Sequence, residues 1–560
     1  MVEKHLSDFL TDEIARRAGL IERQNNADYL ITGIEYDSRK IKPGNIYCAL
    51  RGLHTDGHLF IDDAIARGAQ AIILEEEIPS QPGTPVFLRV RDTRHALSPF
   101  SAAFYGFPSR HLFVIGVTGT EGKSTTVYLI WQLLRLMGQK AGFISTVQYS
   151  SGGDAQFNPE HQTTPEANIV QRIIGEMVEN RVKYAVIEAS SHGLSERTQR
   201  LGDVFFDAAL MTTVTHEHME FHGSWEQYRS DKANLFRSLD KKCIKTESNQ
   251  HTPPLLLNRG KPVQPFGVIN ADDPSAAYFA QATRQRTVLF STHGAKANLS
   301  LLSIEPGSRG SRYEVYVSES NEKLIIKDRL PGAYNAANVL ASLLAVSGLT
   351  DIPIRDIAPK VAQLEPVRGR MTQIDRGQPF ELVVDYAHTP SSFQTIFPPL
   401  RKRISGCGGK IISVFGSAGE RDTQKRHEQG KIAAQYSDLI ILTNEDPRGE
   451  NPMDILEEIA RGCFTDQACI AAQDCKTAEE SERKRIFTRN ENIFLIPDRC
   501  AAIRKALSLA QSQDLVLLLG KGHENSIIYR DGPIPFDEIS EAEKALAEMG
   551  YGTGNSISAE

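Results

Sequence analysis

The stretch GVTGTEGKST carries the clearest chemical signal in the sequence. It lies between an apolar run and an amphipathic segment, which is the strand–loop–helix context of a phosphate-binding loop. Its later glycines would let backbone N–H groups approach phosphate oxygens, Lys123 would reach the outer phosphates of a nucleotide, and Ser124 would hold Mg²⁺. The match is partial, because Val117 stands where the standard loop has glycine. We therefore predict a nucleotide site, with a chance Gly-rich turn as the alternative.

Possible metal ligands follow the next two apolar runs. The segment VIEASSHGL places Glu188 at the end of a predicted strand, where a carboxylate can hold Mg²⁺. The segment THEHMEFHG offers His216, Glu217, His218 and His222. These residue types also suit zinc, but their place beside a phosphate loop favours Mg²⁺. Lys232 follows in the helical pattern YRSDKANLF, and by residue type alone it is predicted to be a solvated helix lysine.

Five apolar runs in the last third of the chain end in charged or polar residues. They occur in the segments ELVVDYAHTP, IISVFGSAGERD, LIILTNEDPR, IFLIPDR and LVLLLGKGHE. In open parallel sheets, ligands bind at the edge formed by the carboxyl ends of the strands. The pattern therefore predicts one composite site, whereas the ordinary polarity of loops would explain only some of the five.

Apolar runs of strand length alternate with helical patterns through most of the sequence. This alternation predicts an α/β fold with mostly parallel sheets. The first part has only short strand-like pieces, and YGFPSRH has the composition of a linker, while the alternation restarts after LEPVRGRM. We therefore predict three domains at residues 1–108, 109–365 and 366–560, with a long polar loop at residues 241–265.

Composition narrows the class of protein further. The 560 residues are 40% hydrophobic and carry a net charge of −7, which argues against a nucleic-acid binder that relies on a positive field. No apolar stretch reaches the ~18 residues of a membrane span, and the charged N-terminus lacks the apolar core of a signal peptide. The seven cysteines are scattered, which predicts free thiols. We expect a cytoplasmic protein without membrane insertion.

The same segments, taken in order, resemble the Mur ligases, the ATP-dependent amide-forming enzymes of peptidoglycan biosynthesis. The resemblance runs through DSRKIKPGNIYCALRG, GVTGTEGKSTT, EASSHGL, THEHMEFHG and DKANLF, and continues through YNAANV, PVRGRM, DYAHTPSSF, NEDPRGENP and GKGHE. It implies an N-terminal UDP-binding domain, a central ATP-binding domain and a C-terminal Rossmann-like domain. It also accounts for Val117, since the phosphate loop of this family lacks the earlier glycine. Glu121 replaces the family's usual asparagine.

The resemblance is strongest to the branch of the family that adds the third amino acid of the stem peptide. It implies that ATP phosphorylates the terminal carboxylate of UDP-N-acetylmuramoyl-L-alanyl-D-glutamate to an acyl phosphate. The amine of the incoming amino acid then displaces phosphate, so that an amide, phosphate and ADP are formed. The implied partners are these small molecules, with no nucleic acid, and the implied state is a monomer.

The resemblance assigns the ATP and metal sites residue by residue. ATP would bind Thr118, Gly119, Thr120, Glu121, Gly122, Lys123, Ser124, Asn335, Asn338, Arg370, Asp385 and His388. Mg²⁺ would bind Ser124, Glu188, His218 and Lys232. The catalytic residues would be Lys123, Lys232 and His218. Lys232 aligns with a family lysine that CO₂ converts to a carbamate, which reverses its interpretation as a solvated residue.

Two further substrate sites are implied. The UDP-N-acetylmuramoyl group would bind Ser38, Thr163, Thr164, Ser190, Glu196 and Thr198. The last two replace a glutamine and an arginine of the family, and Arg197 or Arg200 would compensate. The incoming amino acid would bind Arg421, Glu445, Asp446, Pro447, Arg448, Gly520 and Glu524.

The segment NEDPR bears on which amino acid is added. Family members that add meso-diaminopimelate carry DNPR there, and their arginine holds the distal carboxylate of the substrate. This chain keeps the arginine as Arg448 but has Asp446 in place of asparagine. An extra acid suits ornithine or lysine, yet relatives that add lysine usually lack the arginine. A diamino acid is therefore predicted, with meso-diaminopimelate favoured over L-ornithine or L-lysine.

Two alternative functions are weighed against this one. Another ligase of the same superfamily, such as folylpolyglutamate synthase, is disfavoured by the DSR and SSHG segments. A non-catalytic nucleotide-binding module is disfavoured by the five polar strand ends.

Overall fold

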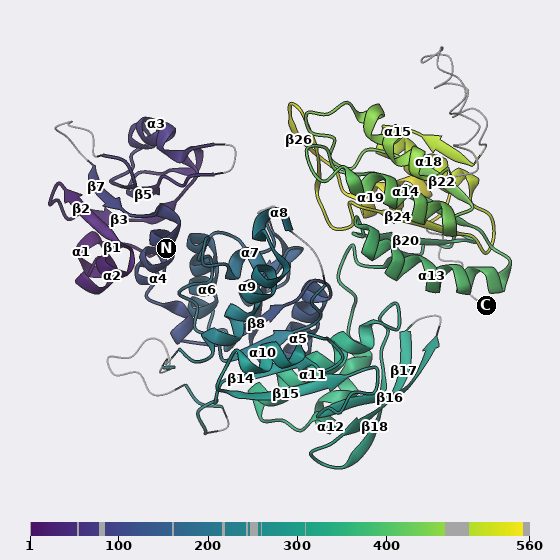
Figure 1. Ribbon diagram of the computed structural model, residues 1–560, viewed down its shortest axis with the longest axis horizontal. Helices are drawn as coiled ribbons and strands as arrows, with labels where there is room; N and C mark the ends of the chain where they lie inside the picture. Colours follow the sequence, from purple (N-terminus) through teal and green to yellow (C-terminus); the bar gives the residue numbers. More distant parts are fainter. Residues whose placement is uncertain are drawn as a thin grey trace, which may run out of the picture. The chain divides into compact units, whose positions relative to one another are not determined.

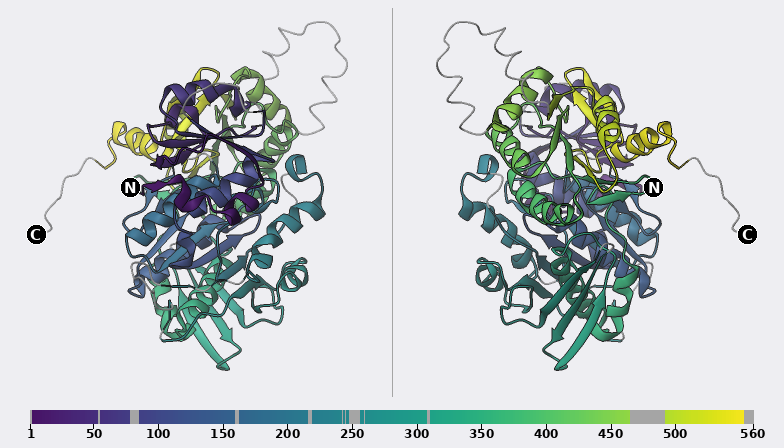
Figure 2. Two further views of the ribbon diagram at one scale, coloured as in Figure 1. Left: turned by 90° about the vertical axis from the view of Figure 1, so that its left-hand side faces the viewer. Right: turned by 90° about the vertical axis from the view of Figure 1, so that its right-hand side faces the viewer.

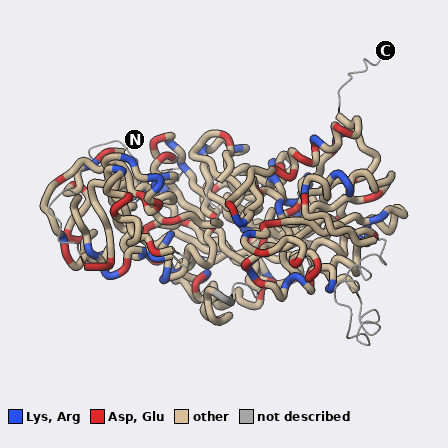
Figure 3. The backbone as a smooth tube through the Cα atoms, turned by 90° about the horizontal axis from the view of Figure 1, so that it is seen from above, with Lys and Arg blue, Asp and Glu red and all other residues tan. Residues whose placement is uncertain are grey.

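The computed structural model describes residues 2–52, 55–77, 85–158, 162–215, 219–241, 243, 245–246, 256–258, 260–307, 310–464 and 492–552. The chain forms two compact units, Met1–Glu365 and Pro366–Glu560 (Figure 1). Acidic and basic residues are interspersed along both units (Figure 3). This distribution agrees with the small net charge of the chain.

The first unit begins with a five-stranded sheet of order β2-β7-β6-β5-β4 and a two-stranded sheet of β1 and β3. The strands are β1 (Lys4–His5), β2 (Leu20–Gln24), β3 (Leu30–Ile31), β4 (Gly33–Glu35), β5 (Asn45–Cys48), β6 (Ala71–Leu74) and β7 (Val86–Val90). The helices are α1 (Leu6–Phe9), α2 (Asp12–Arg17), α3 (Ile61–Ala66) and α4 (Thr93–Phe104), with short turns η1 (Ser38–Lys40), η2 (Gly57–Phe60) and η3 (Pro108–Arg110). Successive residues of β5 face opposite sides: Ile46 packs in the cluster that contains Phe100 of α4, and Tyr47 in the one that contains Ala64 of α3.

An eleven-stranded sheet follows, of order β11-β10-β9-β12-β8-β13-β14-β15-β16-β17-β18. Its strands are β8 (Phe113–Thr118), β9 (Ala141–Ile144), β10 (Gln148–Ser150), β11 (Gln156–Phe157), β12 (Tyr184–Glu188), β13 (Ala208–Met211), β14 (Phe266–Asn270), β15 (Arg286–Ser291), β16 (Leu299–Gly307), β17 (Gly310–Val317) and β18 (Glu322–Lys327). The strands from β9 to β16 in this order are parallel, and both edges are antiparallel. The hairpin of β17 and β18 forms one edge (Figure 2).

Helices cover both faces of this large sheet. They are α5 (Lys123–Leu136), α6 (Ala167–Glu179), α7 (Ser191–Leu194), α8 (Met219–His222), α9 (Trp225–Ser238), α10 (Ala276–Gln281), α11 (Asn335–Thr350) and α12 (Ile354–Ile357), followed by η4 (Ala358–Gln363). Ile115 of β8 packs with α5 and α11, whereas its neighbour Val114 packs with α6 and α9. Because β8 is buried on both faces, its sequence is apolar throughout rather than alternating.

The second unit contains a six-stranded sheet of order β19-β20-β24-β21-β22-β23. The strands are β19 (Thr372–Ile374), β20 (Glu381–Asp385), β21 (Ile411–Phe415), β22 (Leu439–Leu442), β23 (Ile493–Leu495) and β24 (Leu515–Leu519), with a separate hairpin of β25 (Ser526–Tyr529) and β26 (Gly532–Pro535). The helices are α13 (Pro390–Cys407), α14 (Gln424–Tyr436), α15 (Pro452–Gly462), α18 (Arg499–Leu509) and α19 (Glu538–Glu548). Helices α13, α14 and α15 cover one face, and α18 and α19 cover the other.

The predicted α/β fold with mostly parallel sheets is confirmed. All five apolar runs of the second unit are strands, and β20 to β24 pair in parallel, so their carboxyl ends share one edge. The predicted loop at residues 241–265 lies between α9 and β14, and its described residues form no named helix or strand. The five described cysteines are free thiols: Cys48, Cys243, Cys407, Cys463 and Cys500.

Within the described residues, no single helix is long and apolar enough to span a membrane. Helix α11 and the segment Ile354–Gln363 are long and apolar enough for a span only when taken together, and the two are bent by 114° relative to each other. Most residues of α11 are buried in the core of the first unit, which accounts for its apolar sequence.

Candidate active site

The phosphate loop connects β8 to α5 as predicted. Gly119 has φ 146° and Gly122, which precedes α5, has φ 80°. A Cβ atom on Gly119 would lie 1.9 Å from Thr212 Oγ1, and one on Gly122 would lie 2.6 Å from Asn338 Oδ1. Both positions therefore require glycine for space as well as for backbone conformation. The loop leads into the positive N-terminal end of α5, which suits a bound phosphate.

Lys123 is the first residue of α5 and is half-buried. Its Nζ donates a hydrogen bond of 2.7 Å to the Thr120 carbonyl oxygen, so the ammonium folds back over the loop. Thr118 Oγ1 is buried and has no hydrogen-bond partner within the described residues. The side chain of Glu121, the residue that departs from the family pattern, is exposed.

Oxygen ligands for a divalent cation meet at the start of α5. Ser124 Oγ donates a hydrogen bond of 2.9 Å to Glu188 Oε1, and Glu188 Oε2 accepts one of 2.8 Å from the Thr146 N–H. Strands β8 and β12 are parallel neighbours, which places Glu188 beside the loop. A carboxylate and a hydroxyl are the hard ligands that Mg²⁺ prefers, so these residues fit the predicted ion. His216, Glu217 and His218 lie outside the described residues.

Lys232 of α9 is buried beside the phosphate loop. The residue is only 2% exposed, and its Nζ donates a hydrogen bond of 2.6 Å to the Gly119 carbonyl oxygen. The ammonium also lies 4.4 Å from the centre of the Tyr228 ring. The interpretation of Lys232 as a solvated helix residue, drawn from the pattern alone, is therefore wrong. The structure brings it to the loop that carries Lys123.

A buried network of hydrogen bonds supports this region, and no local sequence pattern indicates it. His222 Nδ1 lies 2.7 Å from Asp231 Oδ2, and His222 Nε2 lies 3.0 Å from Ser191 Oγ. Asp231 immediately precedes Lys232 on α9. Both ring nitrogens of His222 thus have hydrogen-bond partners within the protein. The hydrogen bond from His222 to Asp231 therefore anchors α8 to α9.

Asn335 and Asn338, two of the predicted ATP-site residues, connect α11 to α5. Asn338 Nδ2 donates to Asn335 Oδ1 at 2.8 Å, and Asn338 Oδ1 accepts from Thr126 Oγ1 at 3.2 Å. Asn335 Nδ2 donates to the Pro331 carbonyl oxygen at 2.7 Å. Both asparagines are buried, so they lie at the packed end of α11 beside the phosphate loop.

The predicted sugar-site residues of the central sheet lie next to Glu188. Thr164 Oγ1 donates to the Glu188 carbonyl oxygen at 2.8 Å and accepts from the Ser190 N–H at 3.0 Å. Arg200 donates to the Thr164 carbonyl oxygen at 2.9 Å and to Glu166 at 2.8 Å. Of the two arginines predicted to compensate, Arg200 is therefore the one that contacts Thr164.

The other predicted sugar-site residues have different surroundings. Ser38 is buried at the start of η1, and Thr163 is half-buried. Thr198 Oγ1 donates to the His192 carbonyl oxygen and is buried. Glu196 is exposed, and its carbonyl oxygen lies 2.6 Å from a nitrogen of His95.

In the second unit, Asp385 ends β20 in a buried setting. Its two carboxylate oxygens accept hydrogen bonds of 2.7 Å from the N–H groups of Met371 and Ala387. Burial raises the pKa of Asp385, and the nearby positive charge of Arg370 opposes that rise. Arg370 lies 4.8 Å from the centre of the Tyr386 ring. His388 Nδ1 lies 3.0 Å from the Tyr386 carbonyl oxygen.

The segment NEDPR contains two buried polar atoms of opposite charge without partners. Glu445 Oε2 and Arg448 Nε have no hydrogen-bond partner within the described residues. Burial raises the pKa of Glu445, with Lys425 as the largest opposing charge. Arg448 has φ 54°, and its N–H donates to the Ile528 carbonyl oxygen at 2.9 Å, which fixes the backbone that aims the guanidinium.

The remaining amino-acid-site residues surround this segment. Gly520, with φ 102°, is close to Glu445, since a Cβ there would lie 3.1 Å from Glu445 Oε2. A Cβ on Gly419 would lie 2.0 Å from the Pro447 carbonyl oxygen, so the GSAGERD loop packs tightly on NEDPR. Arg421 is exposed, and Glu524 accepts a hydrogen bond of 3.2 Å from the Tyr386 hydroxyl.

Arg499, the charged end of the IFLIPDR run, is a structural residue rather than part of an open site. It forms a fully buried ion pair with Glu538. Its guanidinium donates to the carbonyl oxygens of Asn444 at 2.9 Å and Leu519 at 2.7 Å, and Glu538 Oε2 accepts from the Gly522 N–H at 3.2 Å. The pair therefore ties the loops after β22 and β24 together. Sequence reasoning counted Arg499 among the polar strand ends and missed Glu538.

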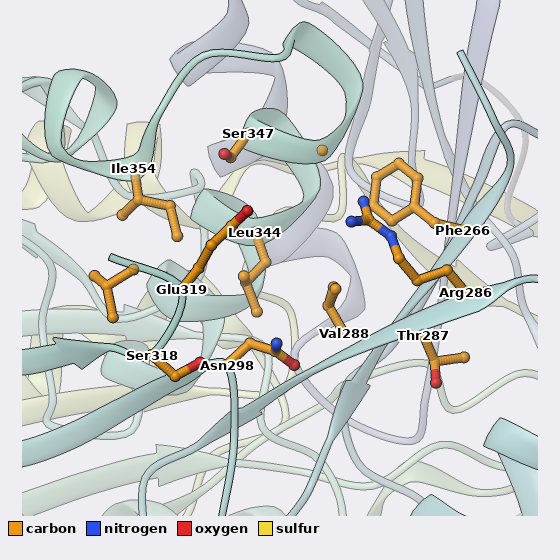
Figure 4. Close-up of a pocket in the computed structure, with 12 residues that line it drawn as sticks. Phe266, Arg286, Thr287, Val288, Asn298, Ser318, Glu319, Leu344, Ser347 and Ile354 are labelled. Carbon is orange, nitrogen blue, oxygen red and sulfur yellow. The ribbon is translucent and has the colours of Figure 1, made fainter. Parts of the chain in front are cut away.

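A separate cavity of about 380 Å³ lies on the central sheet (Figure 4). Its walls come from β14, β15, β17, α11 and α12, and they include Phe266, Val288, Leu344 and Ile354 with Arg286 and Glu319. None of the predicted site residues lines it.

The described residues also place Asp56, His58 and Glu76 together, but both nitrogens of His58 are hydrogen-bonded within the protein.

The fold and these sites indicate an ATP-dependent ligase. One unit carries a phosphate loop with ligands for a cation, and the other carries Glu445 Oε2 and Arg448 Nε, which are buried and have no partner within the described residues. Family models match most of the chain. They are "Mur ligase family, catalytic domain" at residues 30–105, "Mur ligase middle domain" at 117–252 and 254–346, and "Mur ligase, glutamate ligase domain" at 369–522.

The chain belongs to the Mur ligase family, and it is an acid–amino-acid ligase that uses ATP. It is 47% identical to a UDP-N-acetylmuramyl-tripeptide synthetase of Treponema denticola, over 96% of this chain and 98% of that protein. It is 46% identical to the protein of the same name in Treponema pallidum, over 92% and 93%. It is 34% identical to a UDP-N-acetylmuramoyl-L-alanyl-D-glutamate–2,6-diaminopimelate ligase of Geobacillus kaustophilus, over 93% and 96%.

Solved structures support the fold. A structure of a UDP-N-acetylmuramoyl-L-alanyl-D-glutamate–2,6-diaminopimelate ligase aligns with a TM-score of 0.56 and 23% identity, covering 94% of this chain and 98% of that one. The predicted α/β fold is therefore shared with a solved ligase structure along almost the whole chain.

Proposed function

We propose that this ligase adds the third amino acid of the peptidoglycan stem peptide to UDP-N-acetylmuramoyl-L-alanyl-D-glutamate. The observation that carries the proposal is a pair of buried atoms in NEDPR, Glu445 Oε2 and Arg448 Nε, for which the described part of the chain offers no hydrogen-bond partner. A carboxylate and a guanidinium within four residues are complementary to an amino acid, which brings both an amine and a carboxylate. The names of the relatives at 47% and 46% identity support the same reaction.

The first step of the proposed reaction activates a carboxylate. A carboxylate oxygen of the dipeptide attacks the γ-phosphorus of ATP, the bond to the ADP oxygen breaks, and an acyl phosphate forms. Lys123, held at the loop through Thr120, would stabilise the negative charge of the phosphoryl group in transit. The amine of the incoming amino acid then attacks the acyl carbon, and phosphate leaves as the amide forms.

Mg²⁺ would be held by Ser124, Glu188, His218 and Lys232, and when bound it would neutralise phosphate charge. We propose that Lys232 carries a carbamate: its neutral amine adds to the carbon of CO₂ and loses a proton. This change replaces a cation by an anion and makes the residue a suitable ligand for Mg²⁺. The burial of Lys232 at the Gly119 carbonyl oxygen supports a role at the phosphate loop rather than at the surface.

The nucleotide and sugar assignments follow the same proposal. ATP would bind the phosphate loop from Thr118 to Ser124 and the asparagines of α11, and Arg370, Asp385 and His388 would contribute from the second unit. UDP-N-acetylmuramoyl groups would bind Ser38, Thr163, Thr164, Ser190, Glu196 and Thr198. The family has an arginine at the position of Thr198. Arg200, which donates a hydrogen bond to the Thr164 carbonyl oxygen, would replace that arginine in function.

The proposed domain roles are UDP-sugar binding at residues 1–108, ATP binding at 109–365 and amino acid binding at 366–560. The separate five-stranded and eleven-stranded sheets of the first unit, and the six-stranded sheet of the second, support these boundaries. We also propose that the enzyme acts as a monomer in the cytoplasm.

The amino acid itself is proposed to be a diamino acid, with meso-diaminopimelate ahead of L-ornithine and L-lysine. Arg448 would hold the distal carboxylate, and Glu524 would accept from the distal ammonium. Arg421, Glu445, Asp446, Pro447 and Gly520 would complete the pocket. A relative at 34% identity that bears the name of a 2,6-diaminopimelate ligase supports this order.

An ADP-release assay with UDP-N-acetylmuramoyl-L-alanyl-D-glutamate and a panel of amino acids tests the proposal. We expect ADP to form only when both substrates are present, with kcat/KM highest for meso-diaminopimelate. L-alanine and L-glutamate serve as controls, since neither carries a distal ammonium. Absence of turnover with every diamino acid would contradict the proposed function.

A further inference from the structure

A fully buried lysine joins the two loops that carry the proposed amino acid pocket. Lys521 follows β24, and its side chain has no exposed surface. Its Nζ donates to Asp446 Oδ1 at 2.8 Å and to Glu524 Oε2. The same Asp446 oxygen accepts a hydrogen bond of 2.9 Å from the Ile528 N–H. One ammonium group therefore joins the loop after β24 to the loop after β22, and Asp446 in turn binds the backbone of β25.

The lysine is charged in this setting. Burial by itself would lower the pKa of Lys521, but the two carboxylates outweigh that effect and the pKa is raised. A charged lysine buried without partners would be very costly, so the contacts with Asp446 and Glu524 account for its place here.

This arrangement changes how Asp446 is understood. The sequence suggested that an acid in place of the family's asparagine would repel a distal carboxylate and attract a lysine or ornithine side chain. In the structure, the negative charge of Asp446 is met by Lys521 inside the protein. Lys521 therefore offsets one of the two negative charges that Asp446 and Glu524 bring to the pocket.

We propose that Lys521 is a specificity-determining residue, which offsets one of the two negative charges of Asp446 and Glu524 and so lets the pocket accept an amino acid whose distal end bears both an ammonium and a carboxylate. The proposal rests on the proposed function. Lys521 acts through the two carboxylates and is a positioning residue rather than a group that touches the substrate. Meso-diaminopimelate has a distal end with no net charge, and L-lysine has one with a single positive charge, so the two substrates report the charge of the pocket.

The test is the ratio of kcat/KM for meso-diaminopimelate to kcat/KM for L-lysine, measured in the full-length protein. Lys521→Gln makes the pocket more negative, and we expect the ratio to fall by about tenfold or more. Asp446→Asn makes it more positive, and we expect the ratio to rise by a similar factor. The double variant loses one positive and one negative charge, so its pocket has the same net charge as the parent's. Its ratio should therefore return close to that of the parent.

Controls separate this inference from a structural role and from the proposed function. Lys544→Gln removes the same charge from an exposed position on α19 and should leave the ratio unchanged. Equal loss of activity toward both substrates in Lys521→Gln, or a ratio that does not respond to Asp446→Asn, would overturn the inference. If Lys521→Gln does not fold, the rise expected for Asp446→Asn still decides it. No turnover of any diamino acid by the parent would instead overturn the proposed function, and the inference with it.

Discussion

Replacing Lys123 with alanine is expected to lower the rate of ADP formation about a thousandfold, with a small effect on stability. The side chain is half-buried at the start of α5, and its ammonium reaches back to the Thr120 carbonyl oxygen over a loop that has space only for glycine at two positions. Phosphoryl transfer depends mainly on positioned positive charge, so loss of this ammonium removes stabilisation that water cannot replace in an ordered loop. Initial rates of ADP release at saturating substrates measure the effect.

A matched control for Lys123→Ala is Lys140→Ala. Lys140 is exposed beyond the end of α5, and its variant should keep the parent rate. A rate within tenfold of the parent in Lys123→Ala, with the protein folded by circular dichroism, would contradict the assignment of the phosphate loop.

Replacing Lys232 with alanine is expected to lower the rate about a hundredfold or more, and short carboxylic acids should restore part of it. Lys232 is buried and contacts the Gly119 carbonyl oxygen, so alanine leaves a space beside the loop. If the working form of the residue is a carbamate, a small carboxylate that enters this space supplies the missing negative oxygen atoms. The measurement is the rate of ADP release with increasing acetate or propionate, with chloride at the same ionic strength as control.

Rescue distinguishes the carbamate from a purely structural lysine. If Lys232 served only to hold the Gly119 carbonyl oxygen, a carboxylate would not replace it, and the activity of Lys232→Ala would stay low in every acid. Activity equal to the parent in Lys232→Ala would also contradict the proposed role.

The fold was largely predictable because its signals are local. The runs that form β20, β21, β22 and β24 have the length and apolar content of strands buried on both faces, and the parallel pairing follows from the helices between the strands. The phosphate loop was predictable for the same reason, since Gly119 to Ser124 are consecutive.

The parts of the site that depend on distant residues were not predictable in this way. Nothing in the residues around a helical lysine indicates that it is buried, so residue type alone predicted an exposed Lys232. The contact of Lys521 with Asp446 joins residues 75 positions apart, and that of Arg499 with Glu538 joins residues 39 apart. Such pairs form only when segments far apart in the sequence meet at one edge of the sheet, which no spacing rule in the sequence describes.

The reaction route itself can be followed with oxygen-18. The terminal carboxylate of UDP-N-acetylmuramoyl-L-alanyl-D-glutamate is labelled, the enzyme is supplied with ATP and meso-diaminopimelate, and the phosphate and the nucleotide product are analysed by mass spectrometry. An acyl phosphate intermediate predicts that one labelled oxygen appears in the released phosphate and that the product gains the mass of one diaminopimelate residue. ADP formation with unlabelled phosphate, or without the heavier product, would contradict the account.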